Sequence, residues 1–222
     1  MILPQIDQGP LYNQFNFCLP LEVSGNSPAI SSRLPVFLCP SDLYSSGTFN
    51  ITSDAANTVV VVKASPSCYP GCVGNDSSDV GDNSNPGNGI LYRNSRVRFA
   101  DVTDGTTNTI VVGERSWAQT NGTWIGTPNN GLIRAGQKNP YAPLMSPASF
   151  AILAHTHWIN ILTDPDGGMD DYSSLHTGGA HFLFCDGSVR FLSTVTSAGG
   201  IENDYQAMGS RNGGEVQGGF GN

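Results

Sequence analysis

The Asp-Gly dipeptide at 186–187 lies between two runs of β-forming residues and constrains the fold more than any other feature of the chain. An Asp-Gly pair in this setting is typical of a hairpin closed by a two-residue type I′ turn. Such a turn places Phe184 opposite Val189 and Phe182 opposite Phe191. Because side chains alternate between the two faces of a strand, we expect these four residues on the core face of a sheet.

The composition extends this β-rich prediction to the whole chain. Glycine (27) and proline (14) make up 41 of 222 residues, and only 13% of residues are charged. Turn-forming residues at this density predict many short strands joined by loops, and they argue against a coiled coil. We expect an α+β fold with a mostly antiparallel sheet in one domain spanning 1–222. Strands are predicted at 34–39, 59–62 and 109–113, with a helix near 201–208.

The charge balance indicates an exported protein that does not bind nucleic acid. Lysine and arginine number 10 against 18 acidic residues, for a net charge of −8, and no basic cluster occurs. Polyanions such as nucleic acids and anionic membrane surfaces are therefore poor partners. The sequence has no apolar run of about 20 residues that could cross a bilayer, and no signal peptide follows Met1. An exported composition without a targeting segment predicts that such a segment precedes this chain.

Five cysteines are present, at positions 18, 39, 68, 72 and 185. Cys68 and Cys72 are separated by three residues, which is compatible with a local disulfide; the alternative is two unpaired thiols. A zinc site usually shows two close pairs of Cys or His ligands, and the chain lacks a second cysteine pair.

Four aspartates, a cluster typical of an oxygen-ligated cation site, lie close together around two glycines: Asp164, Asp166, Asp170 and Asp171. Several carboxylate oxygens on one flexible loop are what Ca²⁺ prefers. The spacing differs from that of an EF-hand, so the alternatives are a weak calcium site and a solvated acidic loop.

All four histidines fall into two close pairs, His155 with His157 and His176 with His181. In an extended strand the first pair would point to one face. A metal-dependent hydrolase could use these four histidines, whereas the alternative is hydrogen-bonded structural histidines. The chain contains no recognised nucleophile, phosphate-loop or zinc-protease motif, so no catalytic residues are assigned and we expect a non-enzyme.

Several blocks of the sequence together resemble the DUF1559 family of bacterial prepilin-like proteins. The first is His176 followed by nine residues and then Asp186-Gly187, which is similar to the family's H-X9-DG signature. The other blocks, in the order of the chain, are Leu3–Asn16, Val36–Asp42, Asn88–Asn94, Asp101–Thr109 with Gly113-Glu114, and Arg211–Val216.

The resemblance implies a pilin-like head domain that lacks the long N-terminal helix of a pilin precursor. It implies a pseudopilin-like structural subunit of a surface filament or a type II secretion-like apparatus. Such a subunit would lie in the cell envelope, assemble with other pilin-like subunits, and contact the membrane only through a helix absent from this chain. A different possibility is a surface module that binds a glycan or another ligand through Trp117, Trp124 and Trp158 and the Asn-rich loops.

Within the signature, we expect an architectural role over residues 176–192. Gly178 and Gly179 are predicted to let the backbone pass close to a neighbouring element, with His176 hydrogen-bonded beside them. An extended arm of about 17 Å separates residues 181 and 186, so Asp186 is not expected to orient His176 as a catalytic partner.

Overall fold

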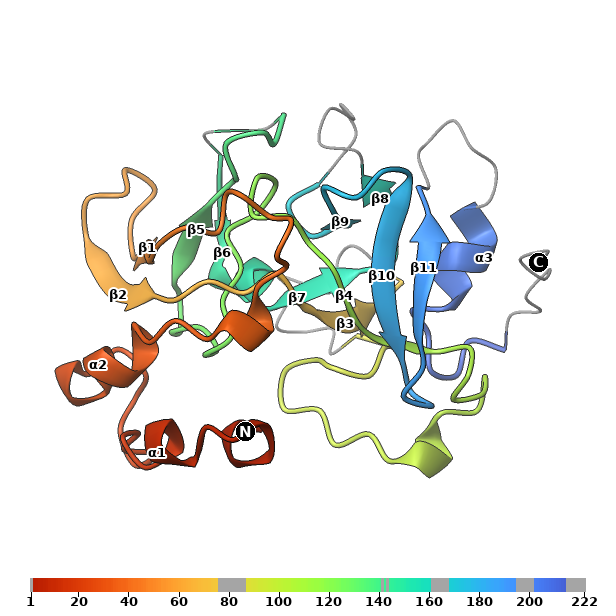
Figure 1. Cartoon of the computed structure of the whole chain (residues 1–222), viewed down its shortest axis with the longest axis horizontal. Helices are drawn as coiled ribbons and strands as arrows, with labels where there is room; N and C mark the ends of the chain where they lie inside the picture. Colours follow the sequence, from red (N-terminus) through yellow and green to blue (C-terminus); the bar gives the residue numbers. More distant parts are fainter. Residues whose placement is uncertain are drawn as a thin grey trace.

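Two β-sheets form the frame of the computed structural model, which describes residues 2–75, 87–140, 142, 144–160, 168–194 and 202–214. The first sheet has the order β2-β1-β5-β6, and the second has the order β11-β10-β4-β3-β7. Figure 1 shows the β10–β11 hairpin beside the C-terminal helix and the first sheet near the N-terminal segments. A mostly β fold with few helices confirms the predicted α+β class.

The strands are short, as the abundance of turn-forming residues predicts. Those of the first sheet are β1 (Phe49–Thr52), β2 (Val60–Ala64), β5 (Leu132–Arg134) and β6 (Met145–Pro147). Those of the second are β3 (Gly71–Gly74), β4 (Ile110–Gly113), β7 (Leu153–His155), β10 (Gly179–Phe184) and β11 (Val189–Ser193). A separate pair joins β8 (Ile159–Asn160) to β9 (Tyr172–Ser173). Within the described ranges the pairing is antiparallel except between β3 and β7 and between β8 and β9.

The helices are also short and lie mostly in the N-terminal part of the chain. The α-helices are α1 (Gly9–Tyr12), α2 (Ser27–Ile30) and α3 (Glu202–Ala207). The 3-10 helices are η1 (Leu3–Ile6), η2 (Ser24–Asn26), η3 (Pro35–Phe37), η5 (Phe99–Asp101) and η6 (Ala148–Ala151). None of the helices in the described part of the chain is both long and apolar enough to cross a membrane.

The largest fully buried aromatic side chains of the described residues, Tyr172, Tyr205, Phe182 and Phe184, belong to one core cluster. Phe182 of β10 packs edge-to-face against Tyr172 of β9, with ring centroids 5.1 Å apart, and against Tyr205 of α3 at 5.8 Å. Phe182 and Phe184 are both buried, which confirms the predicted core face of this strand. The hairpin is therefore held to α3 and β9 by aromatic packing.

The hairpin register differs by one residue from the predicted register. Phe182 pairs with Arg190, and Leu183 pairs with Val189. The N–H of Gly187 donates to the Phe184 carbonyl at 3.0 Å, and Gly187 has a φ of 85°. Among the residues of this described turn, Asp186 is not in the positive-φ region that a type I′ turn requires. The connection is instead a three-residue loop in which a type I turn is followed by a left-handed glycine.

This shift reverses the predicted orientation of β11. Side chains alternate along a strand, so a slip of one residue moves each of them to the other face. Val189 and Phe191, expected in the core, are 64% and 45% exposed, whereas Leu192 is buried. Arg190 instead lies on the Phe184 face, with its guanidinium carbon 4.3 Å from the ring centroid.

Replacing Gly187 by Val is expected to lower the free energy of unfolding by about 1–3 kcal/mol. The reason is backbone strain, since a β-branched residue disfavours the left-handed region. Steric contact is not the cause, because a Cβ at this position would meet no atom within 4 Å. Urea denaturation measures the loss, with Gly187→Asn as the control because Asn tolerates this conformation. Equal losses in both variants would contradict the explanation.

The other predicted elements are confirmed in part. The strand predicted at 109–113 is β4, and the helix predicted near 201–208 is α3. The strand predicted at 34–39 is wrong, because η3 occupies this segment; Pro35 has no N–H for a sheet and begins a helical turn well. The segment 59–62 overlaps β2, but β2 is an edge strand and Val59 and Val60 are exposed.

Candidate functional site

Two consecutive residues after β4 point to opposite sides of the second sheet and organise two different groups of side chains. Glu114 continues the strand, since its N–H donates to the His181 carbonyl and its own carbonyl accepts the N–H of Ser173, both at 3.0 Å. Its carboxylate reaches the histidines of the H-X9-DG segment. Arg115, one residue later, extends toward η6 and β7.

The carboxylate of Glu114 connects both histidines of the segment. Oε1 lies 3.2 Å from Nε2 of His176, and Oε2 lies 3.1 Å from Nδ1 of His181. Oε2 also accepts the backbone N–H of His181 at 2.8 Å. The Glu114 side chain is 8% exposed, while those of His176 and His181 are 30% and 44% exposed. The group therefore combines a buried carboxylate with partly solvent-accessible imidazoles.

Cys39 joins this group from the N-terminal part of the chain. Its Sγ lies 3.7 Å from Nε2 of His176 and 3.1 Å from Oγ of Ser41. The loop is fixed by Asp42, whose N–H donates to the Cys39 carbonyl at 3.0 Å. The Asp42 carboxylate in turn accepts the N–H of Trp117 at 2.7 Å. Cys39, Glu114 and His176 consequently meet, with ligand atoms within 4.8 Å of one another.

The second pair of histidines forms a separate group with the acidic segment. Nε2 of His155 lies 3.5 Å from Oδ2 of Asp170 and 3.3 Å from Oδ1 of Asp171, and Nδ1 of His157 lies 3.8 Å from the same Asp171 oxygen. The two imidazole rings stack with centroids 5.4 Å apart, which confirms that they share one face. His155, His157 and Asp171 also have the proximity that a metal site requires.

The electrostatics of this second group favour an imidazolium between carboxylates. Burial alone would lower the pKa of His155, but the hydrogen bonds and charges of Asp170 and Asp171 outweigh it and raise that pKa to about 9. For Asp170, burial works toward a higher pKa, yet the contact with His155 dominates and the pKa is lowered. Both shifts describe the same buried ion pair.

Arg115 holds the second sheet to the neighbouring segments. It is 1% exposed, and its guanidinium donates to the carbonyls of Leu153 at 3.0 Å, Met169 at 3.2 Å, and Phe150. Burial lowers the pKa of Arg115 to about 10, so the group stays charged at neutral pH. Arg115 is therefore a buried, charged residue whose hydrogen bonds join separate segments of the chain.

The calcium prediction concerns four aspartates, of which Asp164 and Asp166 lie outside the described residues. Asp170 and Asp171 contact His155. Asp171 Oδ2 accepts the N–H of Gly168 at 2.7 Å. A calcium ion at this segment stays a prediction.

Of the two alternatives for Cys68 and Cys72, the structure has the unpaired thiols, because all five cysteines are free. Cys72 lies in β3 and points into the core, while Sγ of Cys68 lies 3.9 Å from Oδ2 of Asp42. Their side chains thus turn to different neighbours. Burial raises the pKa of both thiols to about 12, which makes them unreactive at neutral pH.

Of the two glycines predicted to allow a close backbone approach, Gly179 does so, whereas a Cβ on Gly178 would meet no atom within 4 Å. Gly178 has a φ of 88°. A Cβ on Gly179 would collide with the carbonyl oxygen of Leu192 on the paired strand. His176 and Asp186 have different partners, since Asp186 accepts the N–H of Ser188 at 2.8 Å.

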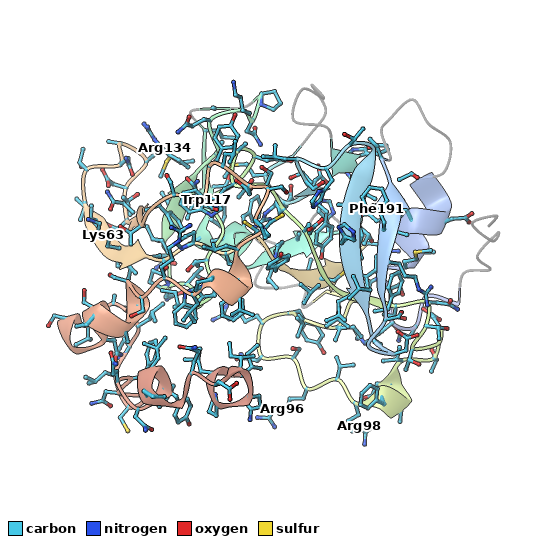
Figure 2. All side chains as sticks on the ribbon, in the orientation of Figure 1. Lys63, Arg96, Arg98, Trp117, Arg134 and Phe191 are labelled. Carbon is cyan, nitrogen blue, oxygen red and sulfur yellow. The ribbon has the colours of Figure 1, made fainter. Side chains whose placement is uncertain are left out.

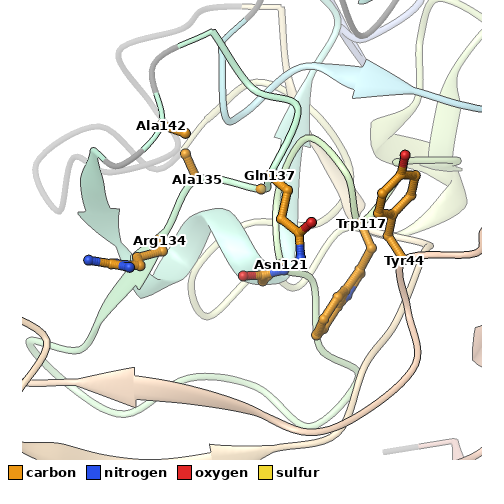
Figure 3. A pocket seen from close by; sticks show the side chains of 8 residues that line it. Tyr44, Trp117, Asn121, Arg134, Ala135, Gln137 and Ala142 are labelled. Carbon is orange, nitrogen blue, oxygen red and sulfur yellow. The ribbon is translucent and has the colours of Figure 1, made fainter.

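A cavity of about 310 Å³ lies between the loop carrying Tyr44 and the segment that follows β5. Figure 3 shows Trp117 beside Tyr44, with Asn121 and Gln137 nearby. The indole offers little surface to a ligand, because Trp117 is 8% exposed and its ring packs edge-to-face on Phe49 at 5.2 Å. Trp158 is 7% exposed. Burial of these indoles argues against a glycan surface built from the three tryptophans.

Comparison with known proteins agrees with the sequence blocks. Residues 1–199 match the family described as "Protein of unknown function (DUF1559)". The chain belongs to the DUF1559 family. No curated protein and no solved structure matches this DUF1559 chain.

Sequence reasoning missed Cys39, Glu114 and Arg115 as members of these groups. The first two lie within blocks that the resemblance to DUF1559 already singled out, Val36–Asp42 and Gly113-Glu114. The blocks did not indicate which of these residues touch in the fold, because Glu114 is 62 residues from His176 in the chain and Cys39 is 137 residues from it. For Arg115 the sequence contains no signal, because a lone arginine is usually exposed.

Proposed function

We propose that this DUF1559 protein is a structural, pseudopilin-like subunit that assembles with other pilin-like subunits at the cell envelope. The observation that carries the proposal is the apolar edge of the second sheet. β11 is the last strand of that sheet and exposes Val189 and Phe191, of which Phe191 is labelled in Figure 2. An edge strand with exposed apolar side chains is a template for contact with another chain.

The organisation of the H-X9-DG segment also supports a structural role. Gly187 closes the hairpin, Gly179 allows the strands to approach, and His176 contacts the carboxylate at the end of β4. Each of these residues serves to present β11 at the edge of the sheet. The acidic composition and the low lysine content are typical of an exported protein, which supports a location at the cell envelope.

Replacing Val189 and Phe191 together by Glu is expected to abolish assembly of the full gene product in its own bacterium. The charges would lie on the proposed contact, while their exposure leaves the core unaffected. Site-specific crosslinking and the amount of protein in the sheared surface fraction measure assembly. Leu43→Glu is the control, because Leu43 is 83% exposed and lies outside the strands of the second sheet. Wild-type crosslinking by the double variant, or absence of the native protein from the envelope fraction, would refute the proposal.

A further inference from the structure

We propose that Cys39, Glu114 and His176 form a zinc-binding site whose fourth position is open to water. The three residues come from the loop after η3, the end of β4 and the segment before β10, so that the site joins three distant parts of the chain. A thiolate, an imidazole and a carboxylate are all ligands that Zn²⁺ accepts, and the thiolate disfavours Ca²⁺ and Mg²⁺. This site goes beyond the assembly proposed above and does not depend on it.

The separations between the ligand atoms fit a tetrahedral ion. Zinc bonds of about 2.0–2.1 Å to nitrogen and oxygen and about 2.3 Å to sulfur give ligand separations of roughly 3.3 Å between N and O and roughly 3.6 Å between N and S. Nε2 of His176 lies 3.2 Å from Oε1 of Glu114 and 3.7 Å from Sγ of Cys39. Two of the three separations therefore match a tetrahedral site, and the third, between Cys39 and Glu114, is within 4.8 Å.

Surrounding groups already orient the carboxylate and one imidazole. Oε2 of Glu114 is held by the N–H and the ring of His181, which leaves Oε1 directed at His176. The N–H of His176 donates to Oγ of Ser174 at 3.0 Å, which fixes the backbone that carries the ring. Such outer contacts position ligands in metal sites. The 30% exposure of the His176 side chain leaves access for the ion and for a water ligand.

The charges of the site match a divalent cation. On binding, the Cys39 thiol releases its proton to solvent as the sulfur–zinc bond forms, and the thiolate and the Glu114 carboxylate together supply two negative charges. The cluster of His155, His157 and Asp171 is a weaker candidate. Both oxygens of Asp171 already accept backbone N–H groups, from Trp158 at 3.3 Å and Gly168 at 2.7 Å.

The experiment measures binding of Co²⁺ and Zn²⁺ to the purified chain after removal of metals with EDTA. We expect one equivalent of Co²⁺ to produce a thiolate-to-cobalt charge-transfer band, and one equivalent of Zn²⁺ to displace it. Cys39→Ser should abolish the band and weaken zinc binding by more than about 100-fold, measured by competition with a chromophoric chelator. Glu114→Gln is the second variant, and circular dichroism verifies that each variant is folded.

Two matched controls separate this site from other thiols and from the other histidines. Cys185→Ser removes a partly exposed thiol that lies outside the cluster, and His157→Gln removes the most exposed member of the second histidine group. Both should keep the charge-transfer band and wild-type zinc affinity. The proposal is overturned if wild-type protein binds no zinc or gives cobalt spectra without a thiolate band. It is also overturned if His157→Gln, rather than Cys39→Ser, loses the ion.

Discussion

Replacing Arg115 by Met is expected to lower the free energy of unfolding by about 3–5 kcal/mol. The guanidinium donates to carbonyls of Leu153, Met169 and Phe150, and methionine fills a similar space without any donor. The Met169 carbonyl keeps the hydroxyl of Thr120 as a donor at 2.7 Å. Each of the other carbonyls, if left buried without a partner, costs about 1–3 kcal/mol, and relief of the buried charge offsets part of the sum. Urea denaturation followed by circular dichroism measures the loss.

Arg98→Met is the matched control for this substitution. The Arg98 side chain is 79% exposed at the edge of the molecule and pairs with Asp101 at 2.9 Å. Exposed ion pairs contribute little to stability, so this variant should unfold like the wild type. If both variants lose the same stability, Arg115 does not hold η6, β7 and the 169–171 segment together.

Raising the pH from 6 to 9.5 is expected to lower the free energy of unfolding by on the order of 3 kcal/mol, because His155 loses its proton. The folded-state pKa of about 9 lies above the ordinary value of 6.5, and this difference corresponds to roughly 3 kcal/mol. A pKa that is raised on folding contributes stability that is complete below pH 6.5. That contribution is lost as the pH rises through about 9. The measurement is the free energy of unfolding at several pH values within this window.

His155→Gln should flatten this pH dependence, and His157→Gln should retain it. The comparison between variants is needed because the buried thiols of Cys68 and Cys72 also make the free energy of unfolding fall as the pH rises, since their pKa values are raised to about 12 in the folded protein. That loss begins near the ordinary thiol pKa of about 8.5 and is common to all variants. A His155→Gln protein with the wild-type slope between pH 6.5 and 8.5 would contradict the assignment of the ion pair to His155.

Local sequence patterns predicted the elements that a short stretch of consecutive residues determines. The Asp-Gly dipeptide predicted a hairpin at its observed place, the apolar run at 109–113 predicted β4, and the pattern near 201–208 predicted α3. The richness in glycine and proline predicted many short strands joined by loops. Motif blocks spread over most of the chain predicted the DUF1559 family, which the match over residues 1–199 confirms.

The hairpin register marks the limit of this local information. Glycine at position 187 suits both a type I′ turn and a type I turn followed by a left-handed residue, and the two differ by one residue in pairing. Burial of Leu192 and exposure of Phe191 accompany the second arrangement. The choice depends on which side chains find partners in α3 and β9, and those contacts are distant in sequence.

By itself, therefore, the sequence determined the α+β class, the position of the main hairpin and the family. Only the tertiary structure decided that Glu114 meets His176 and Cys39, that Arg115 is buried, and that His155 lies between two carboxylates. The physical reason is that β10 pairs with β4 and β4 with β3, an order produced by burial of a shared core. Local propensity determines which residues are extended, whereas the free energy of burying that core determines which strands become neighbours.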